Sequence, residues 1–190
     1  MASAATPFGR DATCLTANGT ERRPLQCEPG HLSLASRAAP VSVLSRKRII
    51  ALRQAFSTIE VETRAPGLFE ITQQIAQWVA AQDVRDGLVT LFIRHTSASL
   101  VVQENADPDV QADLDAFFRR LAPEDSRLYR HTAEGADDMP AHIRAALTAT
   151  QLSIPLRDRR LRLGTWQGIY VFEHRRGRFH RSVDVHVIGE

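Results

Sequence analysis

Hydrophobic and polar positions follow regular periods from about residue 53 onward. Apolar and polar residues alternate over 54–63, which is typical of a half-buried strand. A continuous apolar run over 87–93 predicts a central strand, and 99–103 looks like its neighbour. Apolar positions recur at helical spacing in three further segments, which we expect to be helices: about 69–79, 107–121 and 138–147.

The C-terminal part is a series of short apolar segments separated by turns. We expect strands at hairpin spacing over 151–156, 160–163, 165–172 and 179–188. The predicted order is therefore strand, helix, two strands, two helices and four strands. Because helices and strands are segregated, this order indicates an α+β fold with a mainly antiparallel sheet. There are no internal repeats.

Residues 1–48 show no sustained helix or strand period and are rich in Ala, Ser, Thr, Pro and Gly. We predict a disordered N-terminal extension there and a folded domain over 52–190. No continuous apolar region of a secretory signal is present. An organellar transit peptide would resemble this leader, but three acidic residues argue against one. We favour a start codon assigned too far upstream.

The composition of the chain bears on which classes of partner it can bind. The apolar content of 43% is enough for a core, and no stretch approaches the roughly 20 apolar residues of a membrane helix. Residues 1–48 carry seven bases and three acids, whereas 49–190 carry 17 bases and 19 acids. The domain is thus slightly acidic, and we predict neither a nucleic-acid nor a membrane partner. Both cysteines, Cys14 and Cys27, lie in the extension, so we favour a cytoplasmic location.

Three segments are unusually rich in polar chemistry: 94–109, 134–142, and 164–168 with 173–175. The first follows an apolar strand and carries an imidazole, hydroxyls, amides and carboxylates. Burying a polar group costs free energy because the group loses its hydration. Many polar groups are therefore buried together only if they hydrogen-bond to one another or take part in binding or catalysis. We therefore expect the three segments to form one shared site.

Histidines are the candidate metal ligands. His95, His142 and His174 lie on separate predicted elements, and His131 precedes the second segment in a loop. Three or four of these imidazoles can converge as metal ligands, and three protein ligands with water as the fourth would make a catalytic zinc-type site. The alternative is that each is an ordinary hydrogen-bonded histidine. His180 and His186 alternate with charged residues and are predicted to lie on the surface.

Among the carboxylates, Glu104 is the candidate acid or base. It follows an apolar strand and caps no helix, whereas Asp107 and Asp138 are expected to be helix N-caps. For Trp166, between two glycines, we favour packing in the core over stacking on a ligand ring. Polar side chains in the same three segments are the candidate anion or substrate contacts: Ser97, Ser99, Asn105, Thr165, Gln167 and Arg175. No P-loop or dinucleotide-binding glycine motif is present.

These segments resemble a known family. The motifs at 95–99 (HTSAS), 104–110 (ENADPDV), 134–142 (EGADDMPAH), 163–170 (LGTWQGIY) and 173–175 (EHR) closely resemble the YjbQ-like proteins, in order and over about residues 52–190. These small bacterial and archaeal proteins are also described as secondary thiamine-phosphate synthase enzymes. The resemblance implies a bifurcated, barrel-like sheet with three helices, a homotrimer, and a site built from His95, His142 and His174 with a metal or anion nearby.

The resemblance also implies an activity, the coupling of a hydroxymethylpyrimidine diphosphate to a thiazole phosphate with loss of pyrophosphate. One hypothesis is therefore a metal-assisted transferase. A zinc-like divalent ion would neutralise pyrophosphate, Arg175 would position it, and Glu104 or His95 would handle protons. The alternative is a metal- or small-anion-binding protein without turnover that uses the same histidines. A third hypothesis is another metal-dependent reaction, such as hydrolysis.

Overall fold

The computed structural model describes residues 51–190, and the prediction for residues 1–48 lies outside this part. The strands are β1 Arg53–Thr63, β2 Gly67–Glu70, β3 Gly87–Ile93, β4 Ala98–Glu104, β5 Gln151–Arg157, β6 Arg160–Leu161, β7 Gln167–Glu173 and β8 Phe179–Gly189. The helices are α1 Thr72–Ala80, α2 Pro108–Leu121 and α3 Asp138–Leu147, with a short 3-10 helix η1 Ser126–Leu128.

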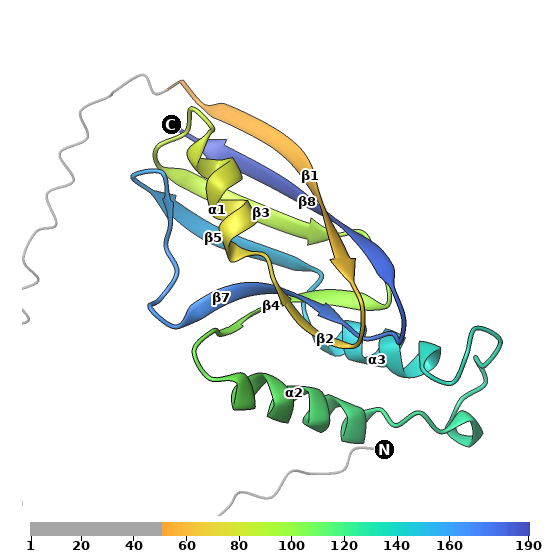
Figure 1. The fold of residues 1–190 in the computed structure, drawn as a ribbon. Coiled ribbons are helices and arrows are strands. Elements are labelled where there is room, and N and C mark those ends of the chain that lie inside the picture. The colour runs from red at the N-terminus through yellow and green to blue at the C-terminus, as the bar shows by residue number, and fades with distance from the viewer. Residues whose placement is uncertain (1–50) are drawn as a thin grey trace, which may run out of the picture. The chain divides into compact units, whose positions relative to one another are not determined.

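The strands form two antiparallel sheets, which together curl into a half-barrel (Figure 1). The larger sheet has the order β1-β8-β3-β5-β6, and the smaller one has the order β2-β7-β4. This confirms the predicted α+β class with a mainly antiparallel, barrel-like sheet and three helices. No helix within residues 51–190 is long and apolar enough to cross a membrane.

Two predicted elements differ in detail. The helix expected from about residue 69 begins at Thr72, because Phe69 belongs to β2 and pairs with Val171 of β7. The strand β3 is central in its sheet as expected, but the prediction that 99–103 is its neighbour is wrong: β3 lies between β8 and β5, and β4 pairs with β7, because residues 94–97 carry the chain into the smaller sheet. Leu88 and Phe92 on the outer face of β3 are 39% and 46% exposed. The apolar run therefore has side chains on both faces of the strand: one set is buried in the core, and the other set is exposed to solvent.

The core lies inside the curled sheet and is covered by α1. The alternation along β1 places Val61 and Thr63 inward, and Ile75 and Val79 of α1 are fully buried. Burying a side chain of this size stabilises the fold by about 1.5–3 kcal/mol before entropy is counted. The core thus fixes β7 and β8, from whose ends the polar clusters project.

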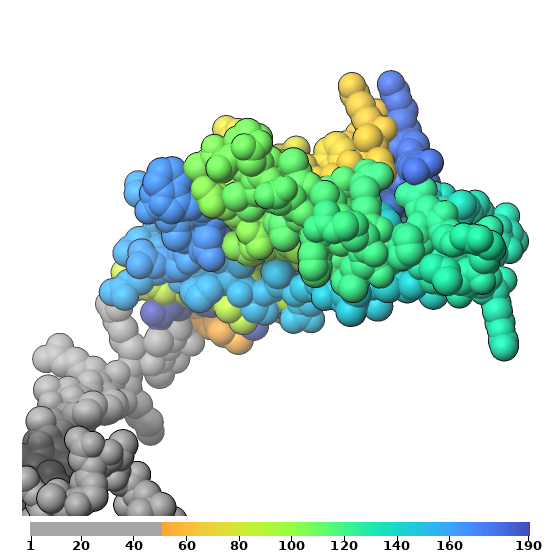
Figure 2. All heavy atoms as spheres, turned by 90° about the horizontal axis from the view of Figure 1, so that it is seen from below, coloured from red at the N-terminus to blue at the C-terminus, as the bar shows by residue number. Residues whose placement is uncertain are grey.

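Helices α2 and α3 lie at the edge of the smaller sheet, on the face that Figure 2 shows from below. The Asp107 side chain accepts a hydrogen bond from the Asp109 N–H at 2.9 Å and Pro108 opens the helix, so the predicted cap is confirmed. Phe118 of α2 packs edge-on against Phe172 of β7, with ring centroids 5.4 Å apart. This contact anchors α2 beside the strand that carries His174.

Candidate functional site

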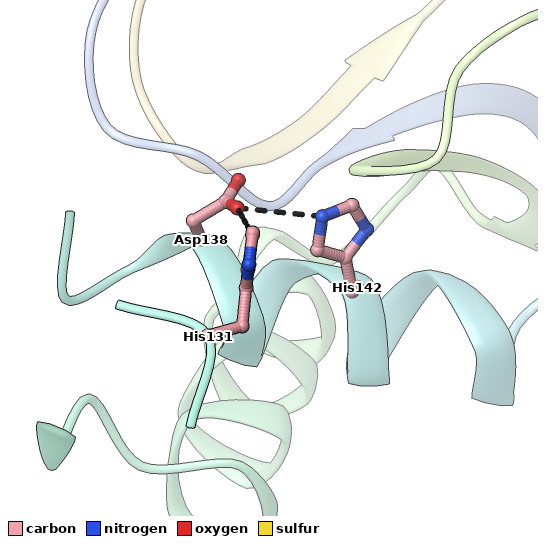
Figure 3. Close-up of side chains that lie close together, drawn as sticks. All are labelled: His131, Asp138 and His142. Atoms are coloured by element: carbon pink, nitrogen blue, oxygen red, sulfur yellow. Dashed lines mark hydrogen bonds and ion pairs between the residues drawn. The ribbon is translucent and has the colours of Figure 1, made fainter. Parts of the chain in front are cut away.

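Three side chains converge at the N-terminal end of α3: His131, Asp138 and His142 (Figure 3). One ligand atom of each lies within 4.8 Å of the other two. The Asp138 Oδ2 atom is 2.6 Å from His131 Nε2 and 3.4 Å from His142 Nε2. Two imidazoles and a carboxylate are ligands that zinc and related divalent metals accept, so the donor set fits a metal ion.

Helix geometry explains how these groups meet. Asp138 and His142 are four residues apart on α3, so they lie on the same face, and His131 reaches them from the loop after η1. The prediction that Asp138 caps the helix is wrong. Asp137 occupies the cap position without a side-chain cap bond, and Asp138 lies inside the first turn with 1% of its surface exposed. The reason is that its carboxylate is used by the histidines and by an arginine.

The ring orientation of His142 is fixed from behind. Its Nδ1 atom lies 3.0 Å from the Thr96 carbonyl oxygen, which can only accept a hydrogen bond. Because Nδ1 donates there, a neutral ring presents the lone pair of Nε2 toward Asp138. A backbone carbonyl that orients a histidine in this way is the usual support of a metal ligand.

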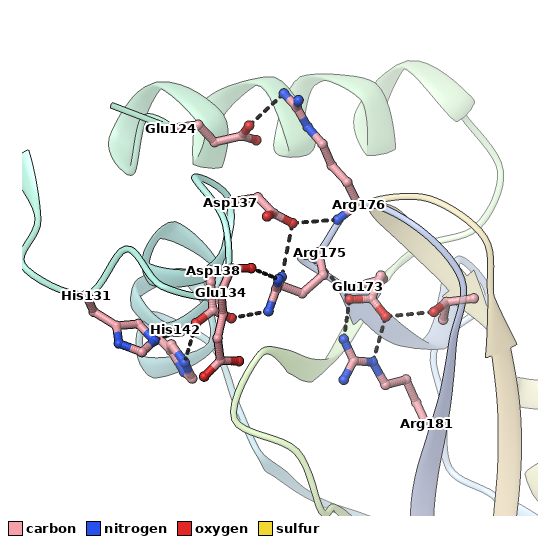
Figure 4. A network of polar contacts seen from close by, with 11 residues as sticks. Glu124, His131, Glu134, Asp137, Asp138, His142, Glu173, Arg175, Arg176 and Arg181 are labelled. Atoms are coloured by element: carbon pink, nitrogen blue, oxygen red, sulfur yellow. Dashed lines mark hydrogen bonds and ion pairs between the residues drawn. The ribbon is translucent and has the colours of Figure 1, made fainter. Parts of the chain in front are cut away.

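Arg175 donates hydrogen bonds to the two carboxylates at the start of α3 (Figure 4). Its Nη1 atom donates to Asp138 Oδ1, its Nε to Asp137 Oδ2 at 3.0 Å, and its Nη2 to the Glu134 carbonyl at 2.8 Å. The guanidinium therefore leaves Asp138 Oδ2 free to face the histidines. Burial would raise the pKa of Asp137, but hydrogen bonds from the Arg176 N–H and from Arg175 outweigh it and lower that pKa.

A second polar cluster, formed by Glu173, Arg181 and Thr63, is buried and fully hydrogen-bonded. Arg181 donates to both carboxylate oxygens of Glu173, at 2.6 and 2.7 Å, and Thr63 donates to one of them at 2.7 Å. Glu173 and Thr63 are 0% exposed and Arg181 is 4% exposed. Burial acts to raise the pKa of Glu173, yet the hydrogen bonds from Arg181 and Thr63 lower it overall. With the Arg175 N–H as a fourth donor at 2.9 Å, no lone pair of the Glu173 carboxylate is left for a ligand.

Two of the three predicted metal-binding histidines have other partners. His174 is 1% exposed, and its Nε2 atom lies 2.9 Å from the Ser99 hydroxyl. Burial lowers the pKa of His174 to about 3, with a smaller contribution from Arg144. His95 accepts a hydrogen bond at Nε2 from the Ser182 N–H at 2.9 Å. Burial and then the charge of Arg181 lower the pKa of His95.

His95 nevertheless shares a pocket with His142. Both line a pocket of about 270 Å³, together with Thr96, Ala145, Ala146 and Thr150. His142 lines this pocket, and its Nε2 atom also lies 3.4 Å from Asp138 Oδ2. Two of the three predicted histidines thus meet at one pocket, and His131 and Asp138 complete the group on the other side of His142.

The remaining predicted contacts lie at the other end of β4 and β7. Glu104 pairs with Gln167, whereas Ala98 pairs with Glu173, so about 20 Å of strand separates the two ends. Asn105 donates its backbone N–H to the Trp166 carbonyl at this far end, next to Thr165. A single chain therefore does not form the one shared site that we expected, because extended strands carry its parts apart.

Trp166 and His131 both differ from what the sequence predicts. Trp166 is 64% exposed, so the expected core packing is wrong. His131, which the sequence offered only as a possible fourth imidazole in a loop, supplies one of the three candidate ligands. A loop has no periodicity to read, and the one available signal was a histidine seven residues before Asp138. Ser97, half-buried between His95 and Ser99, stays a predicted contact.

The chain matches the family model described as UPF0047 protein YjbQ-like over residues 57–190. It is 52% identical to the UPF0047 protein sll1880 of Synechocystis over 138 residues, which cover 73% of this chain and 94% of that protein. It is 44% identical to the UPF0047 protein YjbQ of Salmonella typhimurium over 119 residues, or 62% of this chain and 86% of that protein.

Solved structures give the same result. A YbjQ-like protein of unknown function from Sulfolobus solfataricus aligns with a TM-score of 0.67 at 26% identity, covering 73% of this chain and 99% of that one. A conserved hypothetical protein from Thermus thermophilus aligns with a TM-score of 0.61 at 36% identity, covering 68% of this chain and 97% of that one.

Proposed function

The chain belongs to the UPF0047 YjbQ-like family, and from this premise we propose that it binds a divalent transition metal through His131, Asp138 and His142 and acts on a small phosphorylated substrate. The observation that carries the proposal is the convergence of two Nε2 atoms on one carboxylate oxygen. Three protein ligands leave a coordination position for water or substrate, as in catalytic zinc sites.

The surrounding residues support this assignment. Arg175 occupies Asp138 Oδ1, so the carboxylate offers the metal one oxygen in a fixed direction. The Thr96 carbonyl fixes the tautomer of His142, and His95 lines the adjoining pocket where a substrate would lie. When bound, a divalent ion would stabilise negative charge on a phosphate or diphosphate group. The role of Arg175 in this proposal is to position Asp138 and not to contact the substrate.

The family resemblance narrows the reaction to be tested. It is the thiamine-phosphate synthase type, in which a hydroxymethylpyrimidine diphosphate and a thiazole phosphate are joined and pyrophosphate leaves. A pocket of about 270 Å³ beside the metal ligands suits part of one such substrate. We assign Glu104, Asn105, Thr165 and Gln167 a substrate-binding role only in an assembly of several chains, because they lie at the end of β4 and the start of β7, away from the metal ligands.

The family resemblance also implies a homotrimer, and exposed apolar side chains support self-association. Phe56 of β1 is 65% exposed, and with Phe92 it lines a hollow on the outer face of the larger sheet. Apolar surface of this kind is typical of interfaces between chains. Light scattering of the full chain tests this part of the proposal, with three chains per particle as the expected result. A cytoplasmic location stays a prediction.

Metal binding is tested with cobalt as a spectroscopic probe. Adding Co²⁺ to the full chain should give d–d absorption bands of a nitrogen- and oxygen-ligated ion at one equivalent. His131→Ala and Asp138→Asn should abolish the bands, whereas His180→Ala, an exposed histidine on β8, should leave them unchanged. Retention of the bands in both ligand variants would refute the site.

Activity is a separate measurement. The metal-loaded chain should release pyrophosphate from the two thiamine precursors, and the His131→Ala variant should not. Stoichiometric metal binding without any turnover would favour the alternative, a metal- or anion-binding protein that uses this site without catalysis.

A further inference from the structure

Arg144 is a buried cation that lacks a carboxylate partner within residues 51–190. It lies in the middle of α3 and is 2% exposed. Its Nη2 atom donates to the Ala122 carbonyl at 2.8 Å, but its Nε atom is buried without a partner among residues 51–190. A buried charge is stable only when it is paired or hydrogen-bonded, so this guanidinium needs a further acceptor.

A pocket next to Arg144 provides room for that acceptor. It has a volume of about 230 Å³ and is lined by Arg119, Pro123, Glu124, Arg144 and Arg176. Arg119 is paired with Asp115 at 2.6 Å, and Arg176 with Glu124 at 2.6 Å. Three guanidiniums thus face two carboxylates, and the positive charge left over is that of Arg144.

This pocket is separate from the metal site. Successive helix residues are about 100° apart, so Arg144 lies on the opposite side of α3 from His142. The two neighbouring arginines after β7 diverge in the same way (Figure 4). Arg175 reaches Asp138 at the metal site, whereas Arg176 reaches Glu124 beside α2.

From this arrangement we propose that the pocket is a second binding site, specific for a small anion of the phosphate class. Guanidinium groups bind phosphate oxygens through paired, charge-assisted hydrogen bonds, and an anion in this pocket would supply the counter-charge that Arg144 lacks among residues 51–190. Phosphate offers more acceptor oxygens than a carboxylate does, so it can accept from Arg144 and from a neighbouring arginine together. The site does not require the metal, and it differs from the anion contacts that the sequence suggested.

Inorganic phosphate and pyrophosphate are the probes, titrated calorimetrically into the full chain at constant ionic strength. Arg144→Gln should weaken binding by about tenfold or more, because each charge-assisted contact contributes on the order of 1.5–3 kcal/mol. Arg120→Gln, an exposed arginine on the same helix as Arg119, is the matched control and should change the affinity little.

Glu124→Gln provides a test that does not remove a buried group. It deletes the carboxylate that competes for Arg176, so phosphate should bind several-fold more tightly. No binding by the unaltered chain, or an unchanged affinity in both Arg144→Gln and Glu124→Gln, would overturn the proposal.

His142→Ala separates this site from the metal site and should leave phosphate binding intact. Loss of phosphate binding in this variant would place the anion at the metal site and also refute the second site. Failure of cobalt binding in the experiment above would leave the present proposal untouched.

Discussion

Asp138 and Glu173 are both carboxylates with at most 1% of their surface exposed, and an arginine holds each of them. The difference lies in what remains after pairing. Both oxygens of Glu173 are used by Arg181, Thr63 and the Arg175 N–H. Asp138 gives one oxygen to Arg175 and turns the other toward two imidazoles whose side chains are 43% and 34% exposed.

The comparison teaches that burial alone does not identify a functional carboxylate. A saturated pair such as Glu173–Arg181 fixes the geometry of the strands that carry it. A carboxylate with one oxygen directed at accessible histidines can still take a ligand. Changes on the Glu173 side should therefore alter the stability of the fold, and changes on the Asp138 side should alter the affinity for metal.

The largest expected effect is on stability. Glu173→Ala leaves Arg181 buried and unpaired, so the free energy of unfolding in urea should fall by about 3–5 kcal/mol. The double variant Glu173→Leu/Arg181→Met should lose less, because it removes both charges. Glu62→Ala on β1, whose side chain is 41% exposed, is the control. A loss below 1 kcal/mol in Glu173→Ala would mean that the pair does not stabilise the fold.

The second largest expected effect is the stabilisation of the folded chain by bound zinc, which should depend on the Asp138 site and not on Glu173. Zinc at about 100 times its dissociation constant should stabilise the folded chain by about 2.7 kcal/mol. We expect the zinc-dependent increase in stability to persist in Glu173→Gln, although this variant is less stable than the unaltered chain without zinc. We expect the increase to disappear in His142→Ala. Thermal unfolding with and without zinc measures it. An equal increment in both variants would show that the metal binds elsewhere.

The stability of the folded chain should depend on pH through two buried groups, His174 and Glu173. The pKa of His174 is about 3 in the folded chain against a usual 6.5. Below pH 6.5 the unfolded chain therefore gains a proton that the folded chain does not, and stability falls as the pH falls. The lowered pKa of Glu173 adds its own loss at lower pH, below its usual 4.5.

His174→Gln should flatten this dependence between pH 7 and pH 5 by on the order of 2 kcal/mol. The variant will be less stable at pH 7, because the packing against Phe172 is lost, so the slope with pH is the quantity to compare. An unchanged slope in urea titrations would mean that other groups carry the acid sensitivity.

The smallest expected effect concerns the support of Asp138. Arg175→Lys keeps the charge but cannot reach Asp137, Asp138 and the Glu134 carbonyl together, so metal affinity should fall about tenfold. Arg176→Lys is the matched control, since its side chain contacts Glu124 instead. Equal losses in the two variants, measured by cobalt titration, would indicate a general charge effect.

Local signals in the sequence were sufficient for much of the fold. The alternation in β1, the apolar run of β3 and the Asp107-Pro108 start of α2 each depend on neighbouring residues, and the structure has them. Their order indicated the antiparallel α+β class. Phe69 was misplaced because its pairing with Val171 lies 102 residues away along the chain.

The candidate site needed tertiary information. The sequence determined that histidines and carboxylates are concentrated around residues 94–109, 134–142 and 173–175. Only the folded chain decided that Arg175 holds Asp138 and that His131 joins His142. It also decided that Ser99 and Ser182 each contact the Nε2 atom of one histidine, His174 and His95 respectively. The physical reason is that a hydrogen bond depends on distance and direction in space, and these partners come from different elements of the fold.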